Sequence, residues 1–412
     1  LMRILYNLLM VIIIIFSPII VLYRILKKKE SPTRFLEKFG FLQKKRSSGK
    51  LLWFHCSSVG ELLSIKPLIE KLEKERDIKN ILISTSTLSS SKIFEKFKFK
   101  KTFHQFYPLD NLIIINKFLN HWKPDSVFFV ESEIWPEMLR ALEIRKIKPF
   151  LLNARISKKS FKRWKYFRQV GTTIFDKFEY IFPQNKETYN YLRYFKVKKI
   201  KILGNLKFSG TEKVSVNRSF QNNFCRKIVL CAASTHNNEE DIISNAHLNL
   251  KKKIKNLLTI IIPRHIERSQ EIIENLKFKK LNYLRHSENK KIKKDTDIYL
   301  VDTYGESKLF YSLSKVVFLG GSLVPRGGQN PLEPIRYGCF ITHGKYIFNF
   351  TEIYKMLAKK ELSFEAKNIS GLNKIIFNLL VRKSKNTKEV NKFKKLGNNI
   401  LNKNFVTIRA LV

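Results

Sequence analysis

Short apolar runs alternate with amphipathic segments along the first half of the chain. The runs are rich in β-branched and aromatic residues and end in polar residues, which is typical of buried strands. These predicted strands cover residues 51–55, 80–84, 126–130, 149–153 and 179–182. Apolar residues at helical spacing predict helices at 59–75, 87–97, 135–145, 157–176 and 186–195. Strands and helices that alternate in this way predict a parallel, doubly wound sheet.

A second alternation of the same kind follows a polar segment. Residues 204–226 lose the apolar pattern, so we expect an interdomain linker there. Strands are then predicted at 227–232, 257–262, 297–302 and 316–319, with helices that begin at 239, 267 and 306. The sequence therefore predicts an α/β protein of two Rossmann-like domains, 26–203 and 227–412, the second with C-terminal helices. Ligands of such sheets bind outside the carboxyl ends of the strands, so we expect a site in a cleft that both domains face.

The N-terminal segment is almost wholly apolar. Residues 4–23, interrupted by Asn7, Ser17 and Pro18, are long enough as a helix to cross a hydrocarbon core of about 30 Å. Arg and Lys crowd its C-terminal side. By the positive-inside rule we expect residues 1–25 to form a single-pass membrane anchor, with the other domains on the cytoplasmic side. An interfacial helix is the alternative.

Charge and cysteine content narrow the class of protein. The 412 residues include 79 Lys and Arg against 34 Asp and Glu, a net charge of +45, which suits nucleic acid, anionic membrane or acidic substrates. The basic residues are spread along the whole chain, however, with many Ile, Asn and Phe, a mixture that A/T-biased codons also produce. A nucleic-acid-binding face would concentrate them in a stripe with aromatics between, so we expect no nucleic acid partner. The four cysteines form no CxxC pair, and neither a zinc site nor a disulfide framework is indicated.

The stretch Gly320–Pro334 concentrates the features of an anion-binding corner. It follows a predicted strand and contains two Gly pairs, which allow sharp bends and close approach to a ligand. Arg326 offers a guanidinium suited to a carboxylate or phosphate. Asn330 and Glu333 resemble a capping box around Pro331 at a helix start, and such a start after a Gly-rich turn binds anions. We expect a phosphate or nucleotide-sugar site; a purely structural junction is the alternative.

Polar residues also follow other predicted strands. Glu61 comes after strand 51–55 and could act as a general base, although a Glu in the first turn of a helix also complements its dipole. Glu131 begins a Glu-Ser-Glu sequence after strand 126–130, where helix capping is the alternative. Arg264 and Gly305 follow two strands of the second domain and suit a phosphate or a nucleotide. Each residue taken alone also has a structural explanation, and no DxD or HExxH motif at these loops indicates a metal site.

Taken together, these segments resemble one family closely, the 3-deoxy-D-manno-octulosonic acid (Kdo) transferases that modify lipid A. The matching segments run in family order from the membrane segment to beyond residue 350. They are Ser58–Glu61, Glu131–Pro136, Asn153–Ser157, Gly204–Phe208, Ala233–His236, Pro263–His265, Asp302–Glu306 and Gly320–Glu333. Such a series is far more specific than any one of its members.

The resemblance implies a GT-B fold at the inner membrane and an inverting, metal-independent transfer. CMP-Kdo is then the donor, a lipid A precursor (lipid IVA) is the acceptor, and no cofactor is needed. Glu61 corresponds to the general base, and Glu131 and Lys207 correspond to residues that stabilise the transition state. The implied CMP site consists of Pro263, Arg264, Tyr304, Gly305, Glu306, Asn330, Pro331, Leu332 and Glu333.

The chain departs from the family pattern at a few positions. Tyr304 stands where the family usually has Met, Gln329 where it often has His, and Cys56-Ser57 precede the Ser-Val-Gly-Glu sequence. Two other classes of protein stay open. A catalytically decayed membrane-bound homologue would keep the fold without releasing CMP, and a basic nucleic-acid-binding protein would bind DNA or RNA with strong salt dependence.

Overall fold

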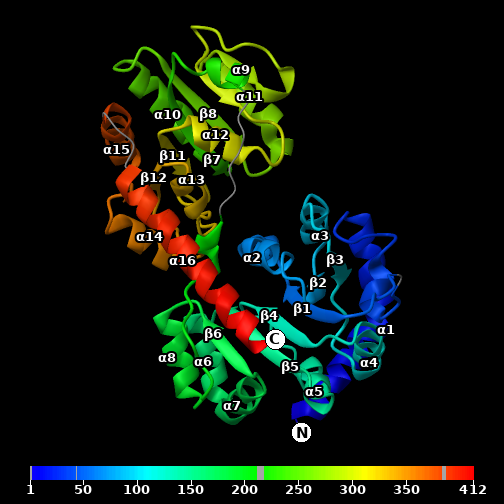
Figure 1. Ribbon diagram of the computed structural model, residues 1–412. Helices are drawn as coiled ribbons and strands as arrows, with labels where there is room; N and C mark the ends of the chain where they lie inside the picture. Colours follow the sequence, from blue (N-terminus) through cyan, green and yellow to red (C-terminus); the bar gives the residue numbers. More distant parts are fainter. Residues whose placement is uncertain (1, 43, 211–217, 383–386) are drawn as a thin grey trace. The chain divides into compact units, whose positions relative to one another are not determined.

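The computed structural model describes residues 2–42, 44–210, 218–382 and 387–412. The chain forms two compact units, Leu1–Gly210 with Leu396–Val412, and Thr211–Lys395. Each unit contains one parallel sheet covered by helices (Figure 1). The predicted doubly wound α/β class is therefore confirmed for both units.

The first unit contains a six-stranded sheet in the order β3-β2-β1-β4-β5-β6. The strands are β1 (Lys50–Cys56), β2 (Ile78–Thr85), β3 (Thr102–Phe106), β4 (Ser126–Val130), β5 (Lys148–Ala154) and β6 (Tyr180–Pro183). The strand order reverses between β1 and β4, which pair in parallel from Leu52 with Ser126 to His55 with Phe129. In open α/β sheets such a switch point is where ligands bind, beyond the carboxyl ends of the strands.

The helices of the first unit cover both faces of this sheet. They are α1 (Met2–Leu26), α2 (Val59–Leu72), α3 (Leu88–Glu95), α4 (Leu112–Trp122), α5 (Pro136–Ile144), α6 (Lys158–Tyr166), α7 (Arg168–Asp176) and α8 (Lys186–Tyr194), with 3-10 turns η1 (Phe35–Phe39) and η2 (Leu206–Ser209). Because successive strand residues point to opposite faces, Trp53 packs in one core cluster with α4, α5 and α7, whereas Phe54 packs in another with α2. The central side chains of both clusters are buried and pack the helices onto the sheet.

One predicted helix differs from the structure. The basic segment 157–176 forms two helices, α6 and α7, because Phe167 between them has φ −114° and ψ 48°, outside the helical range. Helix α6 contains no fully buried residue, but it packs Phe161 and Trp164 against the core cluster that contains Trp53. Strand β3 and helix α4 were not predicted.

The second unit contains a seven-stranded sheet in the order β13-β12-β11-β7-β8-β10-β9. The strands are β7 (Ile228–Thr235), β8 (Leu257–Pro263), β9 (Tyr283–Arg285), β10 (Ile298–Leu300), β11 (Val316–Leu319), β12 (Phe340–His343) and β13 (Ser363–Glu365). The helices are α9 (Arg218–Asn222), α10 (Glu239–Lys251), α11 (Ser269–Phe278), α12 (Ser307–Leu313), α13 (Leu332–Arg336), α14 (Thr351–Ala358) and α15 (Ile369–Val381), with 3-10 turns η3 (Ile266–Arg268) and η4 (His286–Glu288). The strand order reverses between β7 and β11, so the loops that follow these two strands meet at the switch point.

The end of the chain packs in the first unit. Helix α16 (Thr387–Leu411) places Ile400, Leu401 and Ile408 in the core cluster that contains α2. The last residues therefore differ from the predicted second domain, 227–412. The predicted linker 204–226 also differs at its start, because Leu206 is fully buried in that same cluster; residues 211–217 lie outside the described residues.

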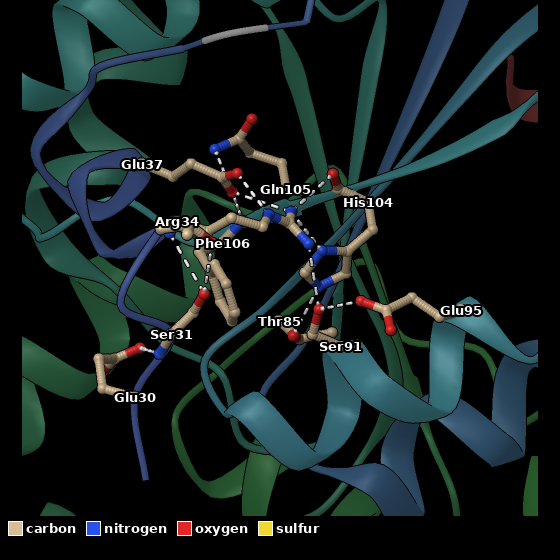
Figure 2. A network of polar contacts seen from close by, with 11 residues as sticks. Glu30, Ser31, Arg34, Glu37, Thr85, Ser91, Glu95, His104, Gln105 and Phe106 are labelled. Atoms are coloured by element: carbon tan, nitrogen blue, oxygen red, sulfur yellow. Dashed lines mark hydrogen bonds and ion pairs between the residues drawn. The ribbon is translucent and has the colours of Figure 1, made fainter. Parts of the chain in front are cut away.

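The segment after α1 is tied to edge strand β3 by a buried polar network (Figure 2). Arg34 donates to both oxygens of Glu37, from Nε to Oε1 at 2.6 Å and from Nη2 to Oε2 at 3.0 Å. Glu37 Oε2 also accepts from the backbone N–H of Phe106 at 2.8 Å and from the side chain of Gln105 at 2.9 Å. Charged groups that are buried together need such complete pairing. The network fixes the C-terminal exit of α1 on the sheet.

Helix α1 is long and apolar enough to cross a membrane over Leu8–Leu26, with a mean hydropathy of 2.7, and is the one such helix among the described residues. Many of its large apolar side chains are exposed, including Leu8, Ile15 and Ile19. This is compatible with a membrane anchor. Near its start, Tyr6 donates a hydrogen bond of 2.6 Å to Asp110 Oδ2 in the body of the unit.

Candidate active site

Glu61 lies in the first turn of α2, directly beyond the carboxyl end of β1. Ser58 caps the helix: its Oγ accepts from the backbone N–H of Glu61 at 3.3 Å and donates to Glu61 Oε1 at 2.9 Å. The backbone N–H of Ser57 donates to Glu61 Oε2 at 2.6 Å. The carboxylate therefore has a capping role, and the same contacts hold it in one position at the switch point of the sheet.

The surroundings of Glu61 suit a group that exchanges protons near neutral pH. Burial, followed by the negative charges of Glu131 and Glu133, raises the pKa of Glu61 to about 7, against the lowering effect of the hydrogen bonds from Ser58 and Ser57. A general base works best when its pKa is close to the working pH. The negative charges of Glu131 and Glu133 therefore lie close enough to Glu61 to affect its ionisation.

Glu131 and Lys207, predicted to act together, form an ion pair. Lys207 Nζ lies 2.6 Å from Glu131 Oε1, and both side chains are largely buried. Glu131 has φ 62°, a left-handed conformation that is uncommon for a residue other than glycine. Strained backbone of this kind is concentrated at functional sites. In this conformation the backbone carbonyl of Glu131 accepts a hydrogen bond from Arg155 N–H at 3.1 Å. The side chain of Glu131 meanwhile contacts Lys207.

Two parts of the chain support the loop that carries Lys207. Asn153, at the end of β5, also has a positive φ (54°), and its Oδ1 accepts from the backbone N–H of Leu206 at 3.0 Å. Helix α16 packs against the same loop at Gly397, where a Cβ atom would lie 2.3 Å from the carbonyl oxygen of Phe208. The C-terminal helix thus belongs structurally to the predicted catalytic site.

His55 is a site residue that the sequence pattern did not single out. It is fully buried at the end of β1, and its Nε2 lies 3.2 Å from Glu133 Oε2. The same carboxylate oxygen accepts from Trp135 Nε1 at 3.0 Å. One feature of the sequence could have indicated this residue: His55 is a polar side chain within an otherwise apolar strand. A Glu-Ser-Glu loop elsewhere in the chain supplies a carboxylate, Glu133, with which it can pair. These contacts hold Glu133 close to Glu61.

In the Gly-rich corner after β11, backbone N–H groups donate hydrogen bonds to a carboxylate from another part of the chain. The buried carboxylate of Glu239 accepts hydrogen bonds from the backbone N–H groups of Gly321 at 2.7 Å, Ser322 at 3.1 Å and Leu323 at 3.0 Å. It also accepts from His236 N–H at 3.0 Å. Burial raises the pKa of Glu239, but the side chain of His236, whose Nδ1 lies 3.7 Å from Oε2, and the backbone hydrogen bonds together outweigh burial and hold the pKa below its usual value. The amides of residues 321–323 are therefore occupied by Glu239, and the phosphate or nucleotide-sugar site at this corner stays a prediction.

Close backbone contact explains the glycine at the start of this corner. A Cβ atom at Gly320 would lie 2.3 Å from the carbonyl oxygen of Ser234, near the end of β7. Any larger residue would push the start of the Gly-rich corner away from the end of β7. Together with the Glu239 bonds, this contact joins the loops after β7 and β11 into one rigid support.

The predicted CMP-binding residues follow strands β8, β10 and β11 of the second sheet. Pro263 ends β8, and Arg264 N–H donates to Thr235 O at 2.9 Å. Asn330 Oδ1 accepts from Leu332 N–H at 3.1 Å. Helix α13 begins at Leu332, one residue later than predicted, with Pro331 at the N-cap position and Glu333 in the first turn. These groups lie at the carboxyl edge of the second sheet, the edge at which sheets of this class generally bind their ligands.

The loop after β10 also has contacts of its own. Tyr304 Oη donates to Glu267 Oε1 at 2.9 Å. Gly305 has φ 90°, a conformation that favours glycine. The carboxylate of Glu306 accepts from Thr303 Oγ1 and lies 3.1 Å from His286 Nε2. Among the described residues, no group of three or more His, Cys, Asp and Glu side chains is arranged to hold a metal ion.

Comparison with known proteins shows which family this chain is similar to. Residues 33–210 match the family model of 3-deoxy-D-manno-octulosonic-acid transferase (kdotransferase). The 3-deoxy-D-manno-octulosonic acid transferase of Rickettsia bellii (strain RML369-C) is 32% identical over 354 residues, which cover 85% of this chain and 84% of the relative. The enzyme of the same name from Haemophilus influenzae is 32% identical over 361 residues, 84% of each chain.

A solved structure shows the same fold without close sequence similarity. The crystal structure of UDP-GlcNAc 2-epimerase from Neisseria meningitidis bound to UDP-GlcNAc has a TM-score of 0.58 and 14% identity, over 88% of this chain and 99% of that chain. The extent of the match to the named transferases identifies the chain as a glycosyltransferase of GT-B type, and the chain belongs to the Kdo transferase family.

Proposed function

We propose that the protein transfers Kdo from CMP-Kdo to a hydroxyl group of a lipid A precursor, lipid IVA, in lipopolysaccharide synthesis, with inversion and without a metal ion. Family membership supports the sugar and the type of reaction. The single observation that carries the mechanism is the position of Glu61, a carboxylate with a pKa near 7 held at the switch point beside the Glu131–Lys207 pair. The donor and acceptor are those that the sequence motifs imply.

In this mechanism Glu61 removes the proton from the acceptor hydroxyl as its oxygen attacks the anomeric carbon of Kdo. The bond between that carbon and the phosphate oxygen of CMP breaks, and CMP leaves with the bonding electrons. Attack from the face opposite CMP inverts the configuration. Lys207, oriented by Glu131, supplies positive charge where negative charge develops, which a fixed charge in a buried site does effectively.

We propose that the second unit binds CMP at the carboxyl edge of its sheet. The amides of residues 321–323 do not contact the phosphate, because Glu239 already accepts their hydrogen bonds. Arg264 and the loops at Tyr304–Glu306 and Asn330–Glu333 are the groups assigned to the nucleotide. Glu333 can accept hydrogen bonds from the ribose hydroxyls. The Gly-rich corner then acts as the support of the site rather than as its phosphate cradle.

We further propose that α1 attaches the protein to the inner membrane, with both units on the cytoplasmic side, where the lipid acceptor is reached. The helix could span the membrane or lie in its interface, and the two arrangements differ in whether the hydrogen bond between Tyr6 and Asp110 can persist. The predicted single-pass anchor requires the hydrogen bond between Tyr6 and Asp110 to break, because the bilayer would separate the two residues. A helix that lies in the interface keeps this bond and immerses the exposed apolar side chains of α1.

Product analysis tests this function directly. The full-length protein in detergent is incubated with CMP-Kdo and tetraacylated lipid A precursor, and the lipid products are resolved by mass spectrometry. We expect an increase in mass by one or more Kdo residues together with release of CMP. Release of no CMP would favour the decayed homologue. Binding of DNA that weakens steeply with salt, without transfer, would favour the nucleic-acid-binding alternative.

A further inference from the structure

A cavity of about 770 Å³ lies in the first unit between α5 and the α6–α7 pair. Its apolar wall consists mainly of Trp164, Phe167, Val170 and Ile174, and Tyr6 of α1 also lines it. The volume lies within the range of roughly 300–1,000 Å³ that is typical of sites for small ligands. An apolar cavity of this size suits a hydrocarbon group better than a nucleotide or a free sugar.

Basic side chains accompany the apolar wall. Arg140, Arg163 and Lys177 line the cavity, together with the buried acidic side chain of Glu137. Arg140 Nε lies 3.4 Å from Glu137 Oε2 and Lys177 pairs with Glu143, whereas Arg163 is exposed on α6. Positive charge beside an apolar wall suits an anionic lipid, whose head group and chain need both.

The surface of α6 next to the cavity also combines basic and aromatic side chains. The helix carries basic residues and no acidic residue over Lys158–Tyr166, and none of its residues is buried. At its junction with α7, Tyr166 is 86% exposed and Phe167 is 55% exposed. Exposed aromatic side chains among Lys and Arg are typical of surfaces that lie in a membrane interface. The opening of the cavity therefore lies beside exposed residues, Tyr166 and Phe167, that a lipid in a bilayer can reach.

The helices that form the cavity begin at the catalytic edge of the first sheet. Helix α5 starts at Pro136, and the residue before it, Trp135, donates to Glu133, which also contacts His55. Helix α6 starts after the N-cap Ser157, close behind β5. A ligand in the cavity thus lies along helices whose first turns adjoin the carboxylates of the site.

We propose that this cavity binds an acyl chain of the lipid acceptor, and that the basic side chains around it bind the acidic head group. The identity of the acceptor rests on the proposed function; the chemical class, an anionic acylated lipid, follows from the cavity itself. The chain would be held by Trp164, Val170 and Ile174, with Arg163 and Arg140 towards the phosphate. The acceptor hydroxyl could then be presented to Glu61 while the chain stays out of water.

Filling the cavity tests this assignment. Thr173 lines the cavity from the exposed side of α7, so Thr173→Trp adds bulk in the cavity without removing a core residue. We expect kcat/KM for a tetraacylated acceptor to fall about tenfold or more, mainly through KM. Transfer to the same phosphorylated disaccharide without acyl chains should be unchanged. The matched control is Thr172→Trp, the neighbouring residue of α7, which is not among the cavity-lining residues.

An acceptor that carries a photoreactive group at the end of an acyl chain separates this proposal from the proposed function. We expect the label in the peptide that contains α6 and α7, reduced by Thr173→Trp and unchanged by Thr172→Trp. Label in another part of the chain, or equal loss of transfer with acylated and deacylated acceptors, would overturn the cavity assignment. If the unaltered protein transferred no Kdo yet took the label in α6 and α7, the proposed function would fail and the lipid site would stand.

Discussion

Replacement of Glu61 by Gln is expected to lower the rate of Kdo transfer by about 100-fold or more, the scale of lost general-base catalysis. The amide cannot take the proton of the acceptor hydroxyl, although it keeps nearly the shape of the carboxylate and one oxygen that accepts from Ser57. CMP affinity should be unchanged, because the residues assigned to CMP lie in the second unit. Initial rates of CMP release and calorimetric titration with CMP measure the two effects.

Glu70→Gln is the matched control for this substitution. Glu70 lies on the same helix, α2, is exposed, and pairs with Lys66 at 2.5 Å. Loss of this surface pair should leave transfer nearly unchanged, since exposed ion pairs contribute about 0–1 kcal/mol. Near-normal turnover of the Glu61 variant would remove Glu61 from the base role, whereas equal losses in both variants would point to damage to α2.

Replacement of Glu239 by Ala is expected to destabilise the second unit by at least about 3 kcal/mol. Each buried donor left without a partner costs roughly 1–3 kcal/mol, and the carboxylate accepts from four backbone N–H groups at the switch point. Water that enters the vacated space would satisfy some of them, so the expected loss is smaller than the sum of four. Hydrogen exchange of the β7 and β11 amides under increasing guanidinium measures the change in this unit alone.

The pH dependence of this effect follows from the lowered pKa of Glu239. A carboxyl group whose pKa is lower in the folded state contributes stability above its unfolded pKa and loses it as pH falls through the folded value. The unaltered second unit should therefore lose stability in acid more steeply than the Ala variant does. Glu274→Ala, an exposed position on α11, is the control and should change neither quantity. Equal stability of the Glu239 variant and the control would show that the four amides do not depend on this carboxylate.

The layered fold could be predicted from the sequence because it depends on local patterns. Buried parallel strands such as Ser126–Val130 are continuous apolar runs, and they indicate both sheets, although β9, β12 and β13 towards the edges of the second sheet were not predicted. Strand β3 was not predicted, because its sequence Thr-Phe-His-Gln-Phe carries polar side chains that bind Arg34 and Glu37 instead of facing water. The break at Phe167 is a change of backbone conformation at a single residue, which the helical spacing of apolar residues in 157–176 does not indicate.

The site was predictable as a set of residues but not as a set of contacts. Glu61, Glu131 and Lys207 came from motifs, yet the ion pair of Glu131 with Lys207 depends on how β5 and α16 hold the loop after Leu203. The contact between Glu239 and the Gly-rich corner was likewise not predictable from the sequence. Nothing local in Gly320–Pro334 indicates that Glu239, from a distant helix, accepts its amides. Contacts between distant segments form only when the sheet brings the strand ends together.

The pH dependence of kcat/KM tests the assignment of Glu61 as the base most directly. Because the base must be ionised, transfer should rise with pH and level off above the pKa of Glu61, about 7. Ser58→Ala removes a hydrogen bond that lowers this pKa and should move the rise to higher pH, whereas Glu133→Gln removes a negative charge that raises it and should move the rise to lower pH. Opposite displacements in the two variants are the predicted result. A rise that stays in place in both variants, or moves in the same direction in both, would contradict the assignment.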